Sequence, residues 1–453
     1  MRRRKFVKQS ILAGSSLALL STGCTCKMDT EFLILGGGLS GLHMANLLQK
    51  AGKDYIVLEG SDRVGGRMFF HPDINKDVGG RGIGNMYKEV MQLVEQFNVE
   101  LTDITPFVNS GQAFYIDGKL IPTWEDNLTN PSKLAYTTSP SPKELTALDE
   151  WYKRPELDES YGDMLTNLGR TKSELDLINI SSNYNDIFTT SAINAYHSTA
   201  FRTFNGSSKI YNFEGGTKMF INSIVNSLTS PIHTRKFITE IKNTDSCCTV
   251  TCSDATSYCA PTVISTLPFS TLRDVKCDVP FNANQNKAIQ NLAYTNITQI
   301  HFKAAEPYWL NDEMPASMWT DTPLERIMTM GFGEDNRDLV CWVNGKGTDF
   351  IDKMSDNELK NYTIKTLQKI RPSTEGKIEY VGAHSWGQYK YNKGAYAEFQ
   401  VGQASLFEDM IKPAGNVYFA GEHTAKKSRG IEGAAESARQ VFDLLKMNKK
   451  IEA

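Results

Sequence analysis

The sequence has little excess charge, no long apolar run and no internal repeat. Its 49 basic and 52 acidic residues give a net charge of −3, which becomes −8 once the five basic residues before Cys24 are left out, so a nucleic-acid partner is excluded. The apolar stretch Ile11–Leu20 has ten residues, too few to cross a bilayer as a helix. Hydrophobic residues at 40% and charged residues at 22% are typical of a folded, soluble chain, and 453 residues suffice for two to four domains.

Histidine is also scarce, with seven residues, and none lies among the clustered cysteines Cys247, Cys248, Cys252 and Cys259. This segment has a β-type composition with a turn at Ser253-Asp254, which favours a hairpin over a zinc site. We therefore expect packed, unpaired cysteines and no metal site; the alternative is a cross-strand disulfide.

The residues before Cys24 have the features of an export signal. A basic start is followed by the apolar stretch and by small residues, and the order Arg3-Arg4-Lys5-Phe6 resembles a twin-arginine signal. We expect residues 1–26 to be this signal, with the twin-arginine translocon as a partner during export and a periplasmic or secreted destination. An ordinary secretory signal is the alternative. Cleavage after Gly23 makes Cys24 a candidate for a lipid anchor at the membrane.

A strand, a glycine turn and a helix follow the predicted signal. The apolar run Glu31–Leu35 meets Gly36-Gly37-Gly38-Leu39-Ser40-Gly41, and a helical pattern then runs to Gly52. Gly36-x-Gly38-x-x-Gly41 is the dinucleotide fingerprint, whose glycines let backbone amides approach a pyrophosphate. A second strand, Tyr55–Leu58, ends at Glu59, where a carboxylate accepts hydrogen bonds from ribose hydroxyls. These elements predict an α/β fold with a Rossmann-type domain.

Two further segments are predicted from local patterns. Ser355 to Glu358 forms a capping box that starts a helix running to Ile370. The run Asn416–Ala420 predicts a last strand, followed by a glycine-rich turn and a helix over about 433–446.

NAD and FAD share the fingerprint, and further motifs favour FAD. Arg63-Val64-Gly65-Gly66-Arg67 resembles the R-x-G-G-R segment of the flavin-containing amine oxidase superfamily, which includes monoamine, polyamine and L-amino acid oxidases. The likeness continues, in family order, through Asp77–Arg81, Glu214–Thr217, Val263–Pro268, Tyr418–Thr424 and Gly430–Ala434. It implies FAD as the cofactor and an amine oxidase-like fold. We expect a discontinuous FAD-binding domain from residues 29–88, 208–285 and 400–448, and an α+β substrate-binding domain from residues 89–207 and 286–399.

The resemblance also implies cofactor contacts. Arg67 would reach the pyrophosphate, although a surface ion pair is the alternative. The backbone of Ile238 would contact adenine, unless Ile238 only packs in the core. Glu422 and the amides near Gly430 and Ile431 would hold the ribityl chain and the N1/O2 edge, where a helix N-terminus stabilises negative charge. The other expected contacts are Gly36, Gly38, Leu39, Ser40, Gly41, Glu59, Gly66, Gly80, Arg81 and Gly421.

The sequence departs from the family pattern next to the flavin. The family has a lysine, bridged through water to flavin N5, shortly before an aromatic pair, and counting back from Pro307-Tyr308-Trp309 places Gln299 there. Gln299 can position a water but cannot act as an acid or base. Lys303 is the alternative if the register slips, since both residues share one face of a strand.

The aromatic wall is also incomplete. Trp386 and Tyr396 match family aromatics, a core aromatic being the alternative for Tyr396. Ala395 replaces the cysteine that bonds to flavin in monoamine oxidases, so FAD should be non-covalent. Ile431 stands where a second aromatic is expected.

For an amino-acid substrate, a buried arginine must pair with the carboxylate. Arg81 is the nearest candidate, and Arg429 and Arg202 are others. With Gln299, Trp386 and Tyr396, Arg81 completes the expected catalytic set.

The resemblance implies oxidation of an amine or amino acid by hydride transfer to flavin N5, with O₂ as acceptor and an imine and H₂O₂ as products. No second dinucleotide site is found, since Gly331-x-Gly333 and Gly345-x-Gly347 lack the third glycine and the following helix pattern, so the substrate itself should be the reductant. A flavin-dependent desaturase or isomerase and a non-catalytic exported flavoprotein remain as alternatives.

Overall fold

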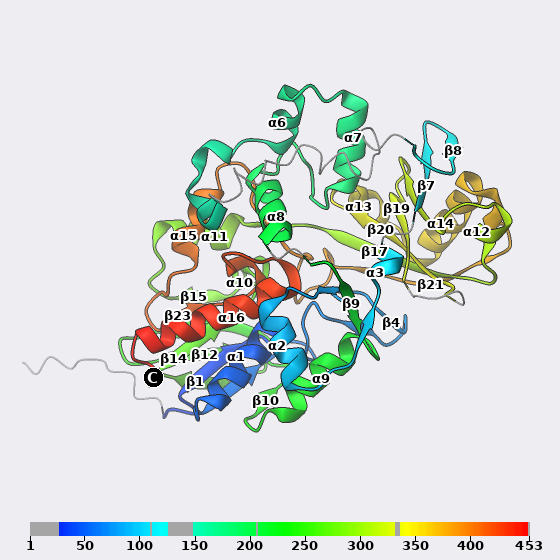
Figure 1. Ribbon diagram of the computed structural model, residues 1–453. Coiled ribbons are helices and arrows are strands. Elements are labelled where there is room, and N and C mark those ends of the chain that lie inside the picture. Colours follow the sequence, from blue (N-terminus) through cyan, green and yellow to red (C-terminus); the bar gives the residue numbers. More distant parts are fainter. Residues whose placement is uncertain (1–26, 109–110, 126–147, 205–206, 331–335, 452–453) are drawn as a thin grey trace, which may run out of the picture.

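The computed structural model describes residues 27–108, 111–125, 148–204, 207–330 and 336–451 (Figure 1). The predicted export signal at 1–26, with Cys24, lies outside these residues, so export and lipidation stay predictions. None of the helices in the described ranges combines the length and apolarity needed to cross a membrane.

A five-stranded parallel sheet forms the base of the fold, in the order β10-β2-β1-β14-β23. The predicted strand, glycine turn, helix and strand are confirmed as β1 (Phe32–Leu35), α1 (Leu39–Lys50) and β2 (Tyr55–Leu58). The other strands come from far along the chain: β10 (Ile232–His233), β14 (Thr262–Ser265) and β23 (Val417–Phe419). Segments almost 400 residues apart therefore build one sheet.

The two faces of this sheet are covered by different layers. Successive side chains of β1 point to opposite faces, so they show which elements cover each face. Ile34 packs with α1 and α16 (Gly430–Met447), which lie side by side in Figure 1. Leu33 and Leu35 pack on the other face against a core that includes strands of a second sheet. The final helix starts at Gly430, three residues before its predicted start, which brings its N-terminus to the edge of the sheet.

The second sheet holds the predicted hairpin. Its order is β13-β12-β11-β15, formed by β11 (Ile238–Asn243), β12 (Cys248–Cys252), β13 (Ser257–Ala260) and β15 (Lys276–Asp278). Cys247, Cys248 and Cys252 are buried and form no disulfide, as expected. Cys259 is disulfide-bonded, so the prediction of an unpaired thiol was wrong there. The alternative, a disulfide across the hairpin, is also wrong, since the other three cysteines of the cluster form no disulfide.

A seven-stranded sheet lies beyond the first two and carries the other half of the site. Its order is β21-β17-β20-β19-β18-β7-β8. Three of these strands are long: β17 (Ile297–Ala304) pairs antiparallel with both β20 (Asp338–Asn344) and β21 (Ile378–Ser385). The others are β7 (Gln112–Ile116), β8 (Lys119–Ile121), β18 (Ser317–Thr320) and β19 (Arg326–Thr329).

One face of the large sheet packs against helices α12 (Tyr308–Asn311), α13 (Lys346–Ile351) and α14 (Asp356–Ile370). The capping box predicted at Ser355 and Glu358 is present at the start of α14. The opposite face of the sheet is the one that carries Gln299.

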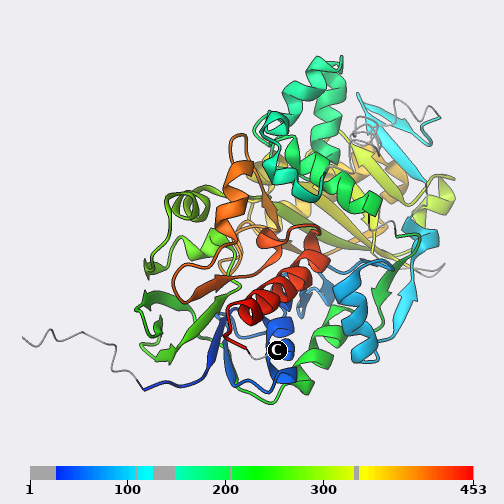
Figure 2. The same cartoon turned by 60° about the vertical axis from the view of Figure 1, so that its left-hand side comes forward.

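Short sheets and helices connect these layers. A three-stranded sheet joins β5 (Ile83–Gly84), β9 (Ile210–Phe213) and β6 (Leu101–Asp103), and pairs form between β3 (Phe70–His71) and β4 (Lys76–Asp77) and between β16 (Ala293–Tyr294) and β22 (Ala397–Glu398). Figure 2 shows the helical segment with α6 (Tyr161–Asn167) and α7 (Lys172–Ser181) standing on the far side from β1. The other α-helices within the described ranges are α2 (Lys88–Gln96), α3 (Thr105–Val108), α8 (Ile193–Phe204), α9 (Thr217–Ser227), α10 (Phe269–Leu272), α11 (Ala283–Asn291) and α15 (Phe407–Met410).

The packing of α2 bears on the expected domain division. Val90 and Leu93 of this helix lie in one core with Leu39 and Leu42 of α1. Strand β6 pairs with β9, inside the predicted FAD-binding segment. The boundary predicted at residue 88 therefore cuts through a packed unit, and α2 and β6 belong with the nucleotide-binding half.

Candidate functional site

One elongated cavity runs from the carboxyl ends of the parallel strands to the large sheet. At one end it is lined by the glycine turn, Glu59 and Ile238, and at the other by Gln299, Trp386 and Tyr396. The carboxyl edge of a parallel sheet is where ligands bind in folds of this kind. Of the predicted site residues, sixteen line this cavity, and Gly41 and Arg81 do not.

The three glycines of the dinucleotide fingerprint, Gly36, Gly38 and Gly41, have different structural roles. Gly38 stands at the N-cap of α1 without a side-chain cap, so the first amides of the helix remain available to a ligand in the cavity. Gly36 has φ of +105°, a left-handed conformation that favours glycine. A Cβ on Gly41 would lie 2.0 Å from the Gly36 carbonyl oxygen. Gly41 therefore lets the helix pack closely on the turn; it lies outside the cavity lining, and its expected cofactor contact stays a prediction.

The Glu59 carboxylate is fixed by hydrogen bonds at the end of the cavity that the glycine turn lines. One carboxylate oxygen accepts the Gly37 amide at 2.7 Å, and the other accepts the Ser61 amide at 2.8 Å and the Ser61 hydroxyl at 2.7 Å. The side chain is buried yet lines the cavity. Each carboxylate oxygen has further acceptor capacity, so Glu59 suits the ribose contact that the sequence predicts.

Arg67 and Glu422 form an ion pair in the cavity wall. Nη1 of Arg67 lies 3.2 Å from Oε2 of Glu422 and donates to the Ala395 carbonyl at 2.7 Å. The same Glu422 oxygen accepts the Ala397 amide at 3.2 Å. The pair is therefore not a surface contact, and it ties the R-x-G-G-R segment to the C-terminal motif. A contact from Arg67 to a pyrophosphate stays a prediction.

The N-terminus of α16 opens onto the same cavity. Gly430 and Ile431 line it, and the N-cap residue Arg429 provides no side-chain cap, so the first amides of this helix can meet an anionic or carbonyl edge. A Cβ on Gly80 would lie 2.9 Å from the Ile431 side chain, so Gly80 allows the two segments to meet.

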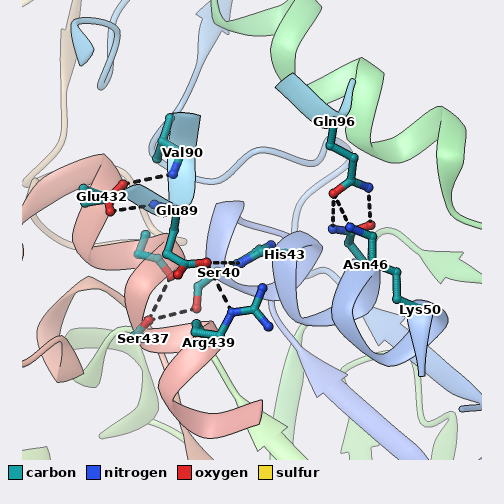
Figure 3. A network of polar contacts seen from close by, with 11 residues as sticks. Ser40, His43, Asn46, Lys50, Glu89, Val90, Gln96, Glu432, Ser437 and Arg439 are labelled. Atoms are coloured by element: carbon teal, nitrogen blue, oxygen red, sulfur yellow. Dashed lines mark hydrogen bonds and ion pairs between the residues drawn. The ribbon is translucent and has the colours of Figure 1, made fainter. Parts of the chain in front are cut away.

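Glu432 fixes this helix end to α2, as Figure 3 shows. Its two carboxylate oxygens accept the amides of Glu89 at 2.8 Å and Val90 at 3.0 Å, in the first turn of α2. Burial raises the pKa of Glu432 to about 7, against the opposing effect of these two amides. Glu89 in turn lies 3.4 Å from His43 and 3.3 Å from Arg439, so α1, α2 and α16 are joined by one polar network.

Gln299 lies on the cavity floor in the middle of β17 and is 2% exposed. His301 Nε2 lies 3.2 Å from Gln299 Oε1, and since an amide oxygen only accepts, the imidazole donates. Burial, together with the positive charge of Arg81, lowers the pKa of His301 to about 3, so this imidazole is neutral. The Gln299 amide nitrogen is left to donate towards the cavity. Lys303 is exposed, so the alternative register is wrong.

Aromatic residues with fixed orientations surround Gln299. Trp386 donates from Nε1 to the Val78 carbonyl at 2.8 Å, and the Tyr396 hydroxyl donates to the Asn183 carbonyl at 2.9 Å. Trp342, opposite Gln299 on β20, adds a third aromatic side chain to the cavity wall. Ala395 lines the cavity where a cysteine would be needed for a covalent flavin bond.

The arginines expected to bind a substrate carboxylate are placed differently from the prediction. Arg81 donates to the Met330 carbonyl at 2.9 Å near Asp77 and lies outside the cavity lining, so the structure lends no support to its expected contacts with flavin and substrate, which stay predictions. Arg429 donates to Ser198 and to the carbonyls of Asn194 and Ala397. The side chain of Arg202 lies outside the part that the structure describes.

Sequence reasoning missed Trp342, which lines the cavity, and His301, which is bonded to Gln299. Each stands on a strand of the large sheet, where its neighbours are set by a cross-strand register between segments about 40 to 80 residues apart. Neither residue has a local sequence signal. Among the described residues, no group of three or more His, Cys, Asp or Glu side chains could hold a metal ion.

Comparisons with known proteins agree with this geometry. A family model described as flavin containing amine oxidoreductase matches residues 39–441. The chain is 24% identical over 95% of its length to "Putative L-amino-acid oxidase YobN" of Bacillus subtilis (strain 168), covering 98% of that protein. It is 23% identical over 92% of its length to bovine flavin-containing amine oxidase A, covering 85% of that protein. The solved structure of wild-type putrescine oxidase bound to putrescine has the same fold, with a TM-score of 0.74 at 18% identity over 92% of this chain and 98% of that one.

Proposed function

Because this chain belongs to the family of flavin-containing amine oxidoreductases, we propose that it oxidises a small amine or amino acid with O₂ as electron acceptor, giving an imine and H₂O₂. It is an FAD-dependent oxidoreductase, the class that its family and its relatives define. One observation supports the proposed reaction most directly: the cavity lined by the nucleotide-binding residues continues into an aromatic chamber at Gln299.

The residues of the cavity fit the cofactor along its length. Glu59 and the first amides of α1 offer an acceptor for a ribose and donors for a pyrophosphate, and the first amides of α16 offer donors at the other end. FAD bound there supplies a flavin ring that accepts a hydride from a substrate C–H bond.

The chain's own residues then orient the substrate and exclude water. Trp386 and Tyr396 have their polar atoms bonded to backbone carbonyls, so their ring faces are fixed for packing against an apolar substrate. Gln299 can hold a water or a substrate atom through its side-chain amide, but a carboxamide takes up no proton near neutral pH. His301 behind it takes up none either, because burial lowers its pKa to about 3. The substrate must therefore react as the neutral amine, a form that an apolar chamber favours.

Anaerobic mixing of the purified holoenzyme with a panel of amines and amino acids tests this proposal. We expect the flavin absorbance to bleach with at least one substrate and H₂O₂ to form when air is admitted. Bleaching without peroxide in air would favour the desaturase or isomerase alternative. No bleaching with any amine or amino acid would contradict amine oxidation.

We also propose that the protein is exported through the segment that contains Arg3 and Arg4. Replacing both arginines by lysine should leave folded, FAD-loaded protein in the cytoplasm. Unchanged amounts outside the cytoplasm would point to the general secretory route.

A further inference from the structure

The loop of residues 386–396, between β21 and β22, connects the two ends of the cavity. It begins and ends at the aromatic residues of the chamber, and its middle reaches the nucleotide end. A Cβ on Gly60, which follows Glu59, would lie 3.5 Å from Cδ1 of Tyr391 and 3.2 Å from the ring of the residue before Ile238. The middle of the loop therefore lies beside the residues that the sequence predicts for ribose and adenine.

Asn392 follows Tyr391 in this loop and is held through its main chain. Its amide donates to the Tyr389 carbonyl at 3.0 Å, and its carbonyl accepts the hydroxyl of Ser270 in α10. The Asn392 side chain lines the cavity and is 7% exposed. Its Oδ1 is buried and accepts no hydrogen bond from the described residues. A buried acceptor without a donor is costly, so a donor from a bound molecule would complete this side chain.

The unpaired group of Asn392 differs from the others in the cavity wall. Among the described residues that line the cavity, Arg63 and Trp342 also have a buried polar atom without a partner, but both atoms are N–H donors. Asn392 offers an acceptor instead. In the adenosine half of FAD the pyrophosphate has no donor, and Glu59 is placed to accept the ribose hydroxyls. The 6-amino group of adenine is the donor that remains.

We propose that the Asn392 carboxamide recognises the adenine of FAD, with Oδ1 accepting a hydrogen bond from the 6-amino group. A carboxamide pairs with adenine through two parallel hydrogen bonds, one from the 6-amino group and one to a ring nitrogen, as asparagine does when it reads adenine in DNA. Asn392 adds this side-chain contact to the backbone contact predicted at Ile238. The inference depends on FAD as the cofactor and not on the proposed oxidation.

Titration of the full-length apoprotein with three flavins, followed by flavin fluorescence, tests the proposal. The flavins are FAD, flavin purine dinucleotide, in which hydrogen replaces the 6-amino group, and FMN, which lacks the adenosine half. We expect the wild type to bind FAD about 5- to 50-fold more tightly than the purine dinucleotide. Asn392→Leu keeps the size of the side chain without the acceptor. It should lose most of that preference and leave the affinity for FMN unchanged.

Two further variants serve as controls. Asn392→Asp keeps an acceptor and should recover most of the preference for FAD. Thr271→Val is the matched control, because Thr271 also lines the cavity but its hydroxyl already donates to the Pro268 carbonyl at 2.9 Å. This variant should keep the wild-type preference. Urea unfolding shows whether each apoprotein is folded.

The wild-type comparison is decisive even without a variant. If the wild type binds FAD and the purine dinucleotide alike, the amino group is not recognised and the proposal is overturned. If Asn392→Leu keeps the full preference, the backbone at Ile238 reads the amino group instead. An equal loss of affinity for all three flavins would mean that Asn392 holds the loop and does not contact adenine. Since no measurement requires turnover, a failure of the proposed amine oxidation would leave these results unaffected.

Discussion

Replacing Gly38 and Gly41 separately by alanine should distinguish cofactor binding from packing in the glycine turn. A Cβ on Gly38 would meet the protein no closer than 3.7 Å, at the Gly66 Cα, and φ of −75° is allowed for alanine. The fold therefore tolerates Gly38→Ala. A Cβ on Gly41 would lie 2.0 Å from the Gly36 oxygen, while a normal contact of this kind needs about 3.3 Å.

The two variants should differ in which property they lose. Gly38→Ala leaves the stability of the apoprotein within about 1 kcal/mol of wild type, since glycine to alanine at an allowed conformation is close to neutral. The added methyl group keeps a pyrophosphate from coming as close to the turn. A loss of about 1 to 3 kcal/mol in the free energy of binding corresponds to FAD binding that is about 5- to 150-fold weaker. Gly41→Ala has to move α1 away from the turn by more than about 1 Å, which costs about 1 to 3 kcal/mol or more in apoprotein stability.

Titration of apoprotein with FAD, followed by flavin fluorescence, gives the affinities, and urea unfolding of the same preparations gives the stabilities. Gly52→Ala is a useful control for the substitution itself, because a Cβ there meets nothing within 4 Å, although its φ of +67° costs some strain. If Gly41→Ala weakened FAD binding without loss of stability, Gly41 would contact the cofactor rather than serve the packing of α1.

Glu59→Ala should weaken FAD binding by about 1.5 to 3 kcal/mol and unpair the Gly37 amide; unchanged affinity in apoprotein titration would remove Glu59 from the ribose site. FAD should be released by acid or heat, because Ala395 cannot bond to it; flavin that remains with the denatured chain would contradict this. Gln299→Lys should speed reoxidation of the reduced flavin by O₂ in stopped flow, because an ammonium in a desolvated cavity stabilises developing negative charge; an unchanged rate would mean that Gln299 is not at N5 or that O₂ is not the acceptor. The protonated side chain of Glu432 stabilises the fold at low pH, and this contribution is lost as the pH rises from about 4.3 towards the raised pKa of about 7. The free energy of unfolding of Glu432→Gln should therefore rise, relative to that of the wild type, by up to about 3 to 4 kcal/mol between pH 4 and pH 8. If urea unfolding gave the same difference between the two proteins at every pH, that pKa would be wrong.

The parts of the site that could be predicted are those whose positions depend on residues close together in the sequence. Gly36, Gly38 and Glu59 belong to one strand, turn, helix and strand, so their positions follow from short-range geometry. Gln299 could be placed on the cavity floor because it is counted from an aromatic pair in α12, a few residues after its own strand. Trp342 could not, because its neighbourhood depends on which strands pair and in which register. The position of Arg81 outside the cavity lining could not be foreseen for the same reason, since its partner Met330 is 249 residues away.

The position of Glu432 near the end of the chain has a consequence for folding during synthesis on the ribosome. The glycine turn leaves the ribosome early. The end of α16 that opens onto the cavity, and the carboxylate of Glu432 that accepts the first amides of α2, are made about 390 residues later. At 5 to 20 residues per second, this interval lasts roughly 20 to 80 s. During that time α2 has no partner for its first amides, and strands β1 and β14 have no β23 beside them. A nascent chain should therefore be unable to retain FAD, and capture of the cofactor becomes an event that follows translation rather than one that guides it.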